Sequence, residues 1–236
     1  MKFNRRNKNE KTVALILAIT LIFTFTACSA GGDNETTTAN TQSTTADTTS
    51  AETEQTEETP TGEKKILTVY FSSANTVDAT SSATPYFDGV ASTEYLAQYI
   101  NKKVGGDIAK ITPVKDYPES YDGTIDAAKK ETDGDARPEF QKLDVNPEDY
   151  DIIFVGYPMW WYTLPMVLYT FFDTYDFSGK TIIPFNTHAG SGDGGTYDEI
   201  QEFEPKATVL DGLAVSGSSA DKADSDIDKW LESLDY

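Results

Sequence analysis

The stretch that decides the fold of this chain is residues 151–165, DIIFVGYPMWWYTLP. Its first part, 151–157, is apolar without alternation, which is typical of a strand covered on both faces. Strands of this kind belong to parallel sheets that carry helices on either side. Its second part, 158–165, is an aromatic loop that begins and ends with proline. The loop therefore leaves the carboxyl end of a parallel strand, which is where such sheets bind their ligands.

Strand-like and helix-like segments alternate over residues 64–236. The other expected strands are 64–72, 107–113, 180–186 and 208–215, and the helices expected from apolar spacing are 92–104, 121–132, 164–175 and 224–234. This alternation predicts a parallel sheet with right-handed crossovers. Residues 64–236 are long enough to bury one core. We therefore expect a single α/β domain built on a doubly wound, five-stranded parallel sheet.

The N-terminal 27 residues have the pattern of a signal peptide. Five Lys or Arg residues accompany an apolar run, Val13–Phe25, that is too short to span a bilayer comfortably. The following Thr26-Ala27-Cys28 resembles the bacterial lipobox, in which the cysteine is lipidated, although Phe25 replaces the usual leucine. Because Cys28 is the only cysteine, lipidation would explain its presence. We expect a lipoprotein anchored to the bacterial cell membrane on its outer side; an uncleaved anchor is the alternative.

Residues 28–63 are expected to be a linker between the lipid and the folded domain. They are rich in Thr, Ser and Glu and contain no aromatic residue. Such a segment cannot bury enough apolar area to offset its ordering entropy, so it is predicted to be disordered. The net charge of the chain is −20, and −24 without residues 1–27, which hold five Lys or Arg and one Glu. This charge repels nucleic acid, which we exclude as a partner.

Three short motifs lie at the ends of expected strands. They are Val69–Ser72 (VYFS), Gly156–Trp161 (GYPMWW) and Thr187–Gly192 (THAGSG). In this order they resemble the flavodoxin-like family, which typically reads YFS, GYPIWW and THGGSG. The resemblance runs from about Lys65 to Leu234. It implies the strand order 2-1-3-4-5, flavin mononucleotide (FMN) as cofactor, and a redox activity.

The second motif carries the side chains expected to meet the flavin ring. Pro158, Met159, Trp160 and Trp161 offer flat apolar surface on a loop stiffened by prolines. The alternative is that the two tryptophans are ordinary core residues.

The third motif is expected to hold the flavin from another side. Gly190 and Gly192 let the backbone approach a ligand closely, and Thr187 and Ser191 can form hydrogen bonds with it. His188, the only histidine of the chain, is expected to line the site rather than to transfer a proton. The alternative is a plain surface turn.

The phosphate loop departs from the family pattern, which is close to SxTGNT followed directly by a helix. We expect an insertion that splits the loop, so that Ser72 at the strand end and Ser92 and Thr93 at the start of the next helix meet the phosphate. Asn75 and Thr76 are an alternative pair of positions. A further alternative is that Ser92 or Thr93 only caps the helix and the phosphate site is lost.

These features together predict an FMN-binding redox protein tethered outside the cytoplasmic membrane. It would pass electrons or hydride to a small molecule or protein, with NAD(P)H, a quinone or a redox protein as candidate partners. The sequence does not separate an FMN-dependent oxidoreductase from an electron carrier, and we assign no catalytic residue and no metal ligand. Two aromatic residues of the insertion, Tyr86 and Phe87, could cover the flavin or could pack at the edge of the sheet. The competing function is a cofactor-free interaction module on the same fold.

Overall fold

The protein is described by a computed structural model that covers residues 64–73, 90–118 and 120–236. Cys28, the linker, the alternative pair Asn75 and Thr76, and the aromatic residues of the insertion lie outside the described residues. The expectations that rest on them stay predictions. Within the described residues, no helix is both long and apolar enough to cross a membrane.

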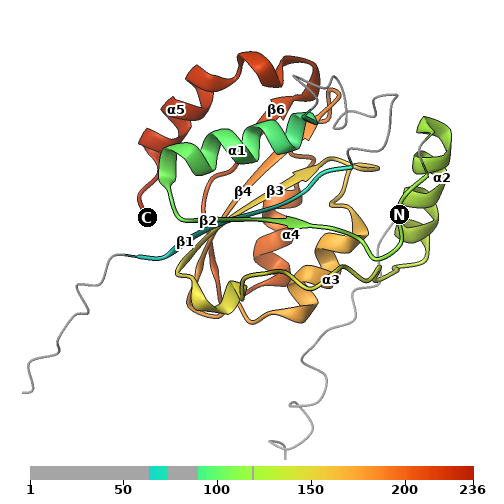
Figure 1. The fold of residues 1–236 in the computed structure, drawn as a ribbon, viewed down its shortest axis with the longest axis horizontal. Helices are drawn as coiled ribbons and strands as arrows, with labels where there is room; N and C mark the ends of the chain where they lie inside the picture. The colour runs from blue at the N-terminus through green and yellow to red at the C-terminus, as the bar shows by residue number, and fades with distance from the viewer. Residues whose placement is uncertain (1–63, 74–89, 119) are drawn as a thin grey trace, which may run out of the picture. The chain divides into compact units, whose positions relative to one another are not determined.

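The described residues form an α/β domain around a parallel sheet (Figure 1). Its strands are β1 (Ile66–Phe71), β2 (Asp107–Ile111), β3 (Ile152–Pro158), β4 (Thr181–His188), β5 (Thr208–Val209) and β6 (Leu213–Ser216). They follow the order β2-β1-β3-β4-β5, and β6 also pairs with β4. The predicted order 2-1-3-4-5 and the parallel pairing are confirmed.

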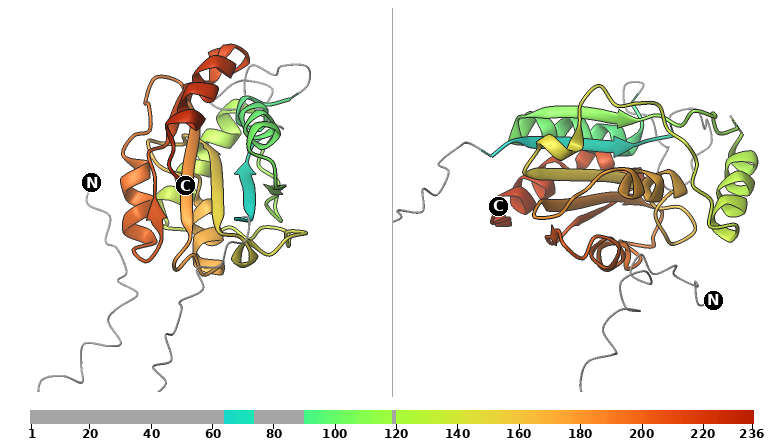
Figure 2. Two further views of the ribbon diagram at one scale, coloured as in Figure 1. Left: turned by 90° about the vertical axis from the view of Figure 1, so that its left-hand side faces the viewer. Right: turned by 90° about the horizontal axis from the view of Figure 1, so that it is seen from below.

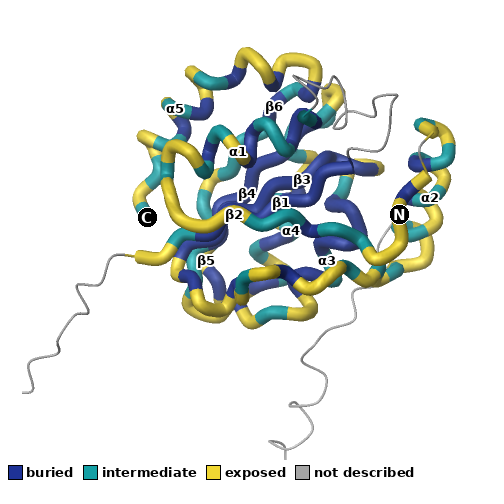
Figure 3. The backbone as a smooth tube through the Cα atoms, viewed as in Figure 1, coloured by how far each residue is buried: buried dark blue, intermediate teal, exposed yellow. Residues whose placement is uncertain are grey.

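Helices cover both faces of the sheet, as Figure 2 shows. The helices are α1 (Ser92–Val104), α2 (Tyr121–Asp133), α3 (Met166–Thr174), α4 (Thr196–Phe203) and α5 (Asp224–Ser233), with short 3-10 turns η2 (Pro147–Asp149) and η3 (Gly217–Lys222). The core is divided in two by the sheet: one half contains residues of α1 and α5, and the other contains residues of α3 and α4. All seven residues of β3 are buried (Figure 3), which explains its unbroken apolar sequence.

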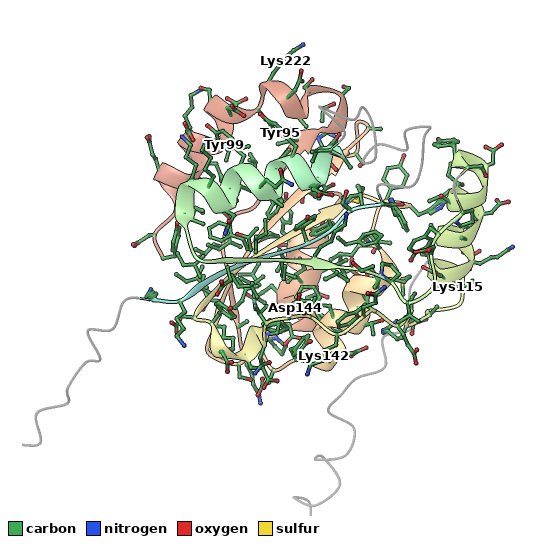
Figure 4. All side chains as sticks on the ribbon, in the orientation of Figure 1. Tyr95, Tyr99, Lys115, Lys142, Asp144 and Lys222 are labelled. Atoms are coloured by element: carbon green, nitrogen blue, oxygen red, sulfur yellow. The ribbon has the colours of Figure 1, made fainter. Side chains whose placement is uncertain are left out.

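Helices α1 and α5 lie side by side and are joined by tyrosine hydroxyls. The Tyr95 hydroxyl donates to the Asp224 carboxylate at 2.8 Å, and the Tyr99 hydroxyl donates to the Asp228 carboxylate at 3.2 Å (Figure 4). Helix α5, which closes the chain, is thus fixed against α1.

The fifth expected strand, 208–215, is wrong in one respect, because the structure divides it into β5 and β6. Val209 pairs with Ile182, an offset of 27 residues, whereas Leu213 pairs with Phe185, an offset of 28. One extra residue therefore enters the strand between these pairs. The cause lies on β4: the Ile182 carbonyl accepts from Leu210, and the next residue facing this neighbour is Pro184, which has no N–H to donate. The ladder breaks there and resumes with a bulge.

Two helices, α4 and α2, differ from the sequence-based expectation: the first was not expected, and the second lies at an unexpected place. The apolar spacing of the sequence does not predict helix α4, because only Thr196 and Ile200 of its eight residues are buried. Helix α2 occupies the predicted residues but stands beyond the carboxyl ends of the strands, as Figures 1 and 2 show, and buries only Thr124 and Ala128. This position brings α2 opposite the loops that follow β3 and β4.

Candidate functional site

A cavity of about 390 Å³ lies where the loops after β3 and β4 face α2. Its lining is Met159, Trp160, Trp161 and Tyr162 from the first loop, Ala189, Gly190 and Ser191 from the second, and Tyr121, Thr124, Ile125 and Ala128 from α2. The structure thus brings together five of the residues predicted for the flavin ring: Met159, Trp160, Trp161, Gly190 and Ser191. A volume of this size is typical of a small-molecule site.

Trp160 belongs to the core as well as to the cavity wall. Its side chain is 4% exposed, and its ring packs edge-on against Phe71 at 5.3 Å and Tyr117 at 4.8 Å between centroids. The alternative that this tryptophan is a core residue therefore describes its packing well. Trp160 is the rigid inner wall of the cavity, and the exposed aromatic surface is supplied by the two residues after it.

Trp161 and Tyr162 form the tip of a two-residue hairpin turn. The N–H of Trp160 donates to the Thr163 carbonyl at 3.1 Å, and the N–H of Thr163 donates back to the Trp160 carbonyl at 3.0 Å. Both tip residues have positive φ, 51° for Trp161 and 62° for Tyr162. Turns of this kind prefer Asn-Gly, because only small residues adopt that backbone without strain. The indole N–H of Trp161 donates to the Ile125 carbonyl of α2 at 3.2 Å.

Pro158 and Thr187 lie at the base of the two loops rather than in the cavity wall. They are paired across β3 and β4, and the Met159 N–H continues the ladder with a hydrogen bond of 2.8 Å to the Thr187 carbonyl. Both residues are buried. Their place in the sheet fixes where each loop begins.

The loop after β4 is shaped by glycines and by a histidine. Gly190 and Gly192 have positive φ, 114° and 62°, a backbone that side chains with a Cβ adopt only under strain. The Gly190 N–H donates to Nδ1 of His188 at 2.9 Å, so the neutral imidazole carries its proton on Nε2. Burial lowers the pKa of His188, and Asp193 opposes this more weakly. His188 is therefore a neutral hydrogen-bonding group at neutral pH.

Asn186 holds the far side of the same loop. It is fully buried in β4, its amide donates to the Gly192 carbonyl at 3.0 Å, and its carbonyl oxygen accepts from the Tyr197 hydroxyl. Tyr197 is fixed by α4, which begins directly after the glycines. Neither side chain is predicted for the site from the sequence, although Asn186 is the last residue of the expected strand 180–186. Their contacts pre-organise the loop without reaching the cavity.

The three residues predicted for the phosphate have different surroundings. Ser92 and Thr93 are fully buried in the first turn of α1. The Ser92 hydroxyl donates to the Gly217 carbonyl at 3.0 Å, and the Thr93 hydroxyl lies 2.7 Å from the Thr187 hydroxyl. Ser72 is 5% exposed, and its hydroxyl has no hydrogen-bond partner in the part of the chain that the structure describes. A buried, unpaired hydroxyl is costly, so it indicates a polar partner at this place.

Ser72 lines a second cavity of about 170 Å³ at the carboxyl ends of β1 and β2. Tyr117 lines this smaller cavity, and its ring packs edge-on against Trp160, which lines the larger one. The two cavities thus share one aromatic wall. Helix α1 begins at Ser92, and its N-cap residue Ala91 provides no side-chain hydrogen bond to the first turn.

These features fit FMN. The larger cavity offers aromatic surface and closely approaching backbone for an isoalloxazine ring, and the Ser72 hydroxyl, which has no hydrogen-bond partner among the described residues, suits a phosphate or ribityl oxygen. The residues that the sequence missed are Tyr162 and the α2 wall. Tyr162 lies within the aromatic loop 158–165, and Tyr121 begins the expected helix 121–132.

Comparison with known proteins agrees with this geometry. Residues 65–234 match the Flavodoxin family, so the chain belongs to it. The domain is similar to a protein from Bacteroides eggerthii, assigned provisionally as a flavoprotein, with 25% identity, a TM-score of 0.56, and coverage of 72% of this chain and 97% of that one. It is also similar in fold to a Lactobacillus acidophilus flavoprotein in complex with FMN, with 23% identity, a TM-score of 0.52, and coverage of 72% and 99%. A search of curated protein sequences found no match.

Proposed function

We propose that this chain is an FMN-dependent redox protein that binds the flavin ring in the cavity between α2 and the loops after β3 and β4. The observation that carries the proposal is this aromatic cavity beside the buried Ser72 hydroxyl, which has no hydrogen-bond partner within residues 64–73, 90–118 and 120–236. Bound FMN would supply one-electron and two-electron redox chemistry. The chain would supply the rigid Trp160 wall, the backbone of Gly190 and Ser191, and the exclusion of water from the ring.

Titration of the purified chain with FMN tests the proposal, with flavin fluorescence as the measurement. We expect FMN fluorescence to be quenched fully when one molar equivalent of protein is present, and the protein to turn yellow. Riboflavin is the matched control, because it differs from FMN only in lacking the phosphate. Tighter binding of FMN than of riboflavin would support a retained phosphate site, and Ser72→Ala should reduce that difference. A colourless protein that leaves FMN fluorescence unchanged would contradict the proposal.

A cofactor-free interaction module is the second candidate function. It is favoured by the internal hydrogen bonds of Ser92 and Thr93, which engage both hydroxyls with other parts of the protein. Under this function neither FMN nor riboflavin binds. The same titration therefore decides between the two candidates.

The location of the domain is a separate part of the proposal. Cys28 would carry the lipid, residues 1–27 would be removed, and residues 28–63 would tether the domain outside the cytoplasmic membrane. Cell fractionation tests this: the natural chain should sediment with membranes and incorporate labelled palmitate, and Cys28→Ala should abolish the labelling. An unlabelled natural chain would contradict the anchor and leave the flavin site untouched.

The electron partners also remain part of the proposal. NAD(P)H, a quinone or a redox protein are the candidates that the sequence suggested. Anaerobic NADH or NADPH should bleach the flavin absorbance rapidly if the chain is a nicotinamide-dependent oxidoreductase. Absence of bleaching would favour a chain reduced by another donor.

A further inference from the structure

Glu199 of α4 joins the loop after β3 to two helices. The Tyr169 hydroxyl of α3 donates to Oε1 of Glu199 at 2.8 Å. The Thr163 hydroxyl lies 3.2 Å from Oε2 of Glu199 and 2.7 Å from the Tyr169 hydroxyl. All three side chains are partly buried. Thr163, Tyr169 and Glu199 therefore form one closed hydrogen-bonding cluster, the Glu199 cluster, which includes the last residue of the hairpin turn.

Thr163 closes the turn that presents aromatic side chains to the cavity. Its N–H and its carbonyl both pair with Trp160, and the two residues between them, Trp161 and Tyr162, have positive φ. Strained backbone of this kind persists only where the surrounding contacts over-determine it. The burial of Trp160 fixes one side of the turn. The Glu199 cluster fixes the other side.

Tyr169 is held firmly by its own surroundings. Its ring packs edge-on against Phe203 at 5.8 Å between centroids. The Arg137 guanidinium lies over the same ring, 5.2 Å from its centroid, and is itself bonded to the Asp173 carboxylate at 2.8 Å. Burial and the Glu199 carboxylate raise the pKa of the Tyr169 phenol, so its hydroxyl stays protonated and able to donate. The cluster is therefore a fixed support for the turn.

Helix α4 thus supports both loops that border the cavity. Tyr197 of this helix holds the loop after β4 through Asn186. Glu199 holds the loop after β3 through Thr163. None of the three side chains of the Glu199 cluster is among the described residues that line the cavity. Any effect of the cluster on a bound molecule must therefore act through the position of the turn.

We infer that Glu199 is a positioning residue for the flavin ring: through Thr163 it holds the tip Trp161–Tyr162 at the edge of the cavity. This inference rests on the proposed FMN site, since it names what keeps one wall of that site in place. Without the carboxylate, the two hydroxyls of the cluster keep only their contact with each other. The strained turn can then relax, and the ring contacts of the flavin change although every lining residue is still present.

The experiment uses the full chain and a set of matched variants. Glu199→Ala removes the carboxylate, whereas Glu199→Gln keeps an oxygen that can accept from Tyr169 and an amide that can donate to Thr163. Thr163→Val removes the hydroxyl and keeps the branched shape. Asp198→Ala is the control, because it removes an exposed carboxylate from the same first turn of α4.

The measurements report on the bound flavin and, separately, on the turn. Fluorescence titration gives the FMN affinity, and visible circular dichroism at saturating FMN reports the surroundings of the bound ring. Acrylamide quenching of tryptophan fluorescence needs no flavin. Trp161 is 46% exposed, whereas Trp160 and Trp230 are only 4% and 8% exposed, so this quenching mainly reports the turn. Urea midpoints give the stability of each variant.

We expect Glu199→Ala to weaken FMN binding by about tenfold, which corresponds to the loss of a hydrogen bond to a charged group. It should also change the visible circular dichroism of bound FMN and increase acrylamide quenching. Glu199→Gln should restore all three measurements toward those of the natural chain, and Asp198→Ala should leave them unchanged. Because Glu199 acts through Thr163, adding Glu199→Ala to Thr163→Val should weaken FMN binding further by less than about threefold.

Unchanged acrylamide quenching in Glu199→Ala would overturn the inference, and so would additive losses of FMN affinity in the double variant. A lower urea midpoint with an unaltered dichroism spectrum of bound FMN would assign Glu199 to stability alone. If Glu199→Ala does not fold, Thr163→Val decides by the same measurements, because it leaves the bond between Tyr169 and Glu199 in place. Failure of the natural chain to bind FMN would contradict the proposed function, and acrylamide quenching would still show whether Glu199 holds the turn.

Discussion

The Thr93 hydroxyl lies 2.7 Å from the Thr187 hydroxyl, and both side chains are fully buried. This contact joins the first turn of α1 to the carboxyl end of β4. It therefore links the place expected for the phosphate to the loop expected at the flavin ring. Movement of the first turn of α1 away from β4 would cost free energy, because it would leave a buried hydroxyl without its partner.

Thr93→Val should lower the free energy of unfolding by about 1–3 kcal/mol, because it leaves the Thr187 hydroxyl buried without its partner. Thr93→Val combined with Thr187→Val should recover part of that loss, since both polar groups are then removed. Urea denaturation of the two single variants and the double variant measures the coupling. Strictly additive losses would show that the two hydroxyls do not interact.

Trp160→Ala and Trp161→Ala should separate the two tryptophans. Trp160 is buried against Phe71 and Tyr117, so its loss should cost about 3–5 kcal/mol of stability. Trp161 is half exposed, and its loss should cost much less while weakening FMN binding. Urea denaturation and FMN fluorescence titration provide the two measurements. Equal destabilisation by both changes would mean that Trp161 is also a core residue.

Gly156→Ala should destabilise the sheet strongly. A Cβ at this position would lie 2.2 Å from Cζ of Phe185 on β4, so the ring must move. Overpacking of this kind costs about 1–3 kcal/mol or more. Adding Phe185→Leu should restore part of the stability by making room, and urea denaturation measures both. If the second change fails to help, the contact between the two strands is not the cause.

Acid should weaken the fold partly through His188. Burial lowers the pKa of its imidazole below the ordinary value of about 6.5, so the unfolded chain takes up this proton first as the pH falls. The neutral ring stabilises the folded state above about pH 6.5, and that contribution is lost progressively below it. Protonation of Nδ1 would also break the hydrogen bond from Gly190.

His188→Asn is the matched variant, because its side-chain oxygen can still accept from the Gly190 N–H while the side chain no longer titrates. The urea midpoint should fall less between pH 8 and pH 5.5 for this variant than for the natural chain. Carboxylates titrate in both proteins, so the difference between the two isolates the histidine. An identical fall would exclude His188 from the acid response.

Much of the fold could be predicted because its signals are local. The buried run 152–158 marks a covered strand, and the motifs at the ends of β1, β3 and β4 identify the family and the edge of the sheet where a ligand is expected. The division of the last strand could not be predicted, since its cause is Pro184 on the neighbouring strand. Helix α4 was missed because it buries little apolar surface.

The sequence indicated that the aromatic and glycine loops leave the same edge of the sheet, and both line one cavity, but it did not indicate which residues hold Ser92 and Thr93. Ser92 bonds to a carbonyl 125 residues away, and Thr93 to a hydroxyl 94 residues away. No local pattern indicates such contacts, which follow from how the first helix packs on the sheet. The position of α2 was hidden for the same reason, because its polar sequence also suits an ordinary surface helix.

The bulge opposite Pro184 affects whether a second copy of this protein can add a strand to the sheet. The outermost strand on that side is divided into Thr208–Val209 and Leu213–Ser216, so no long straight row of unpaired backbone groups is presented there. Short and irregular sheet edges resist strand addition by a second chain. The missing N–H of one proline thus disfavours strand addition at this edge of the sheet.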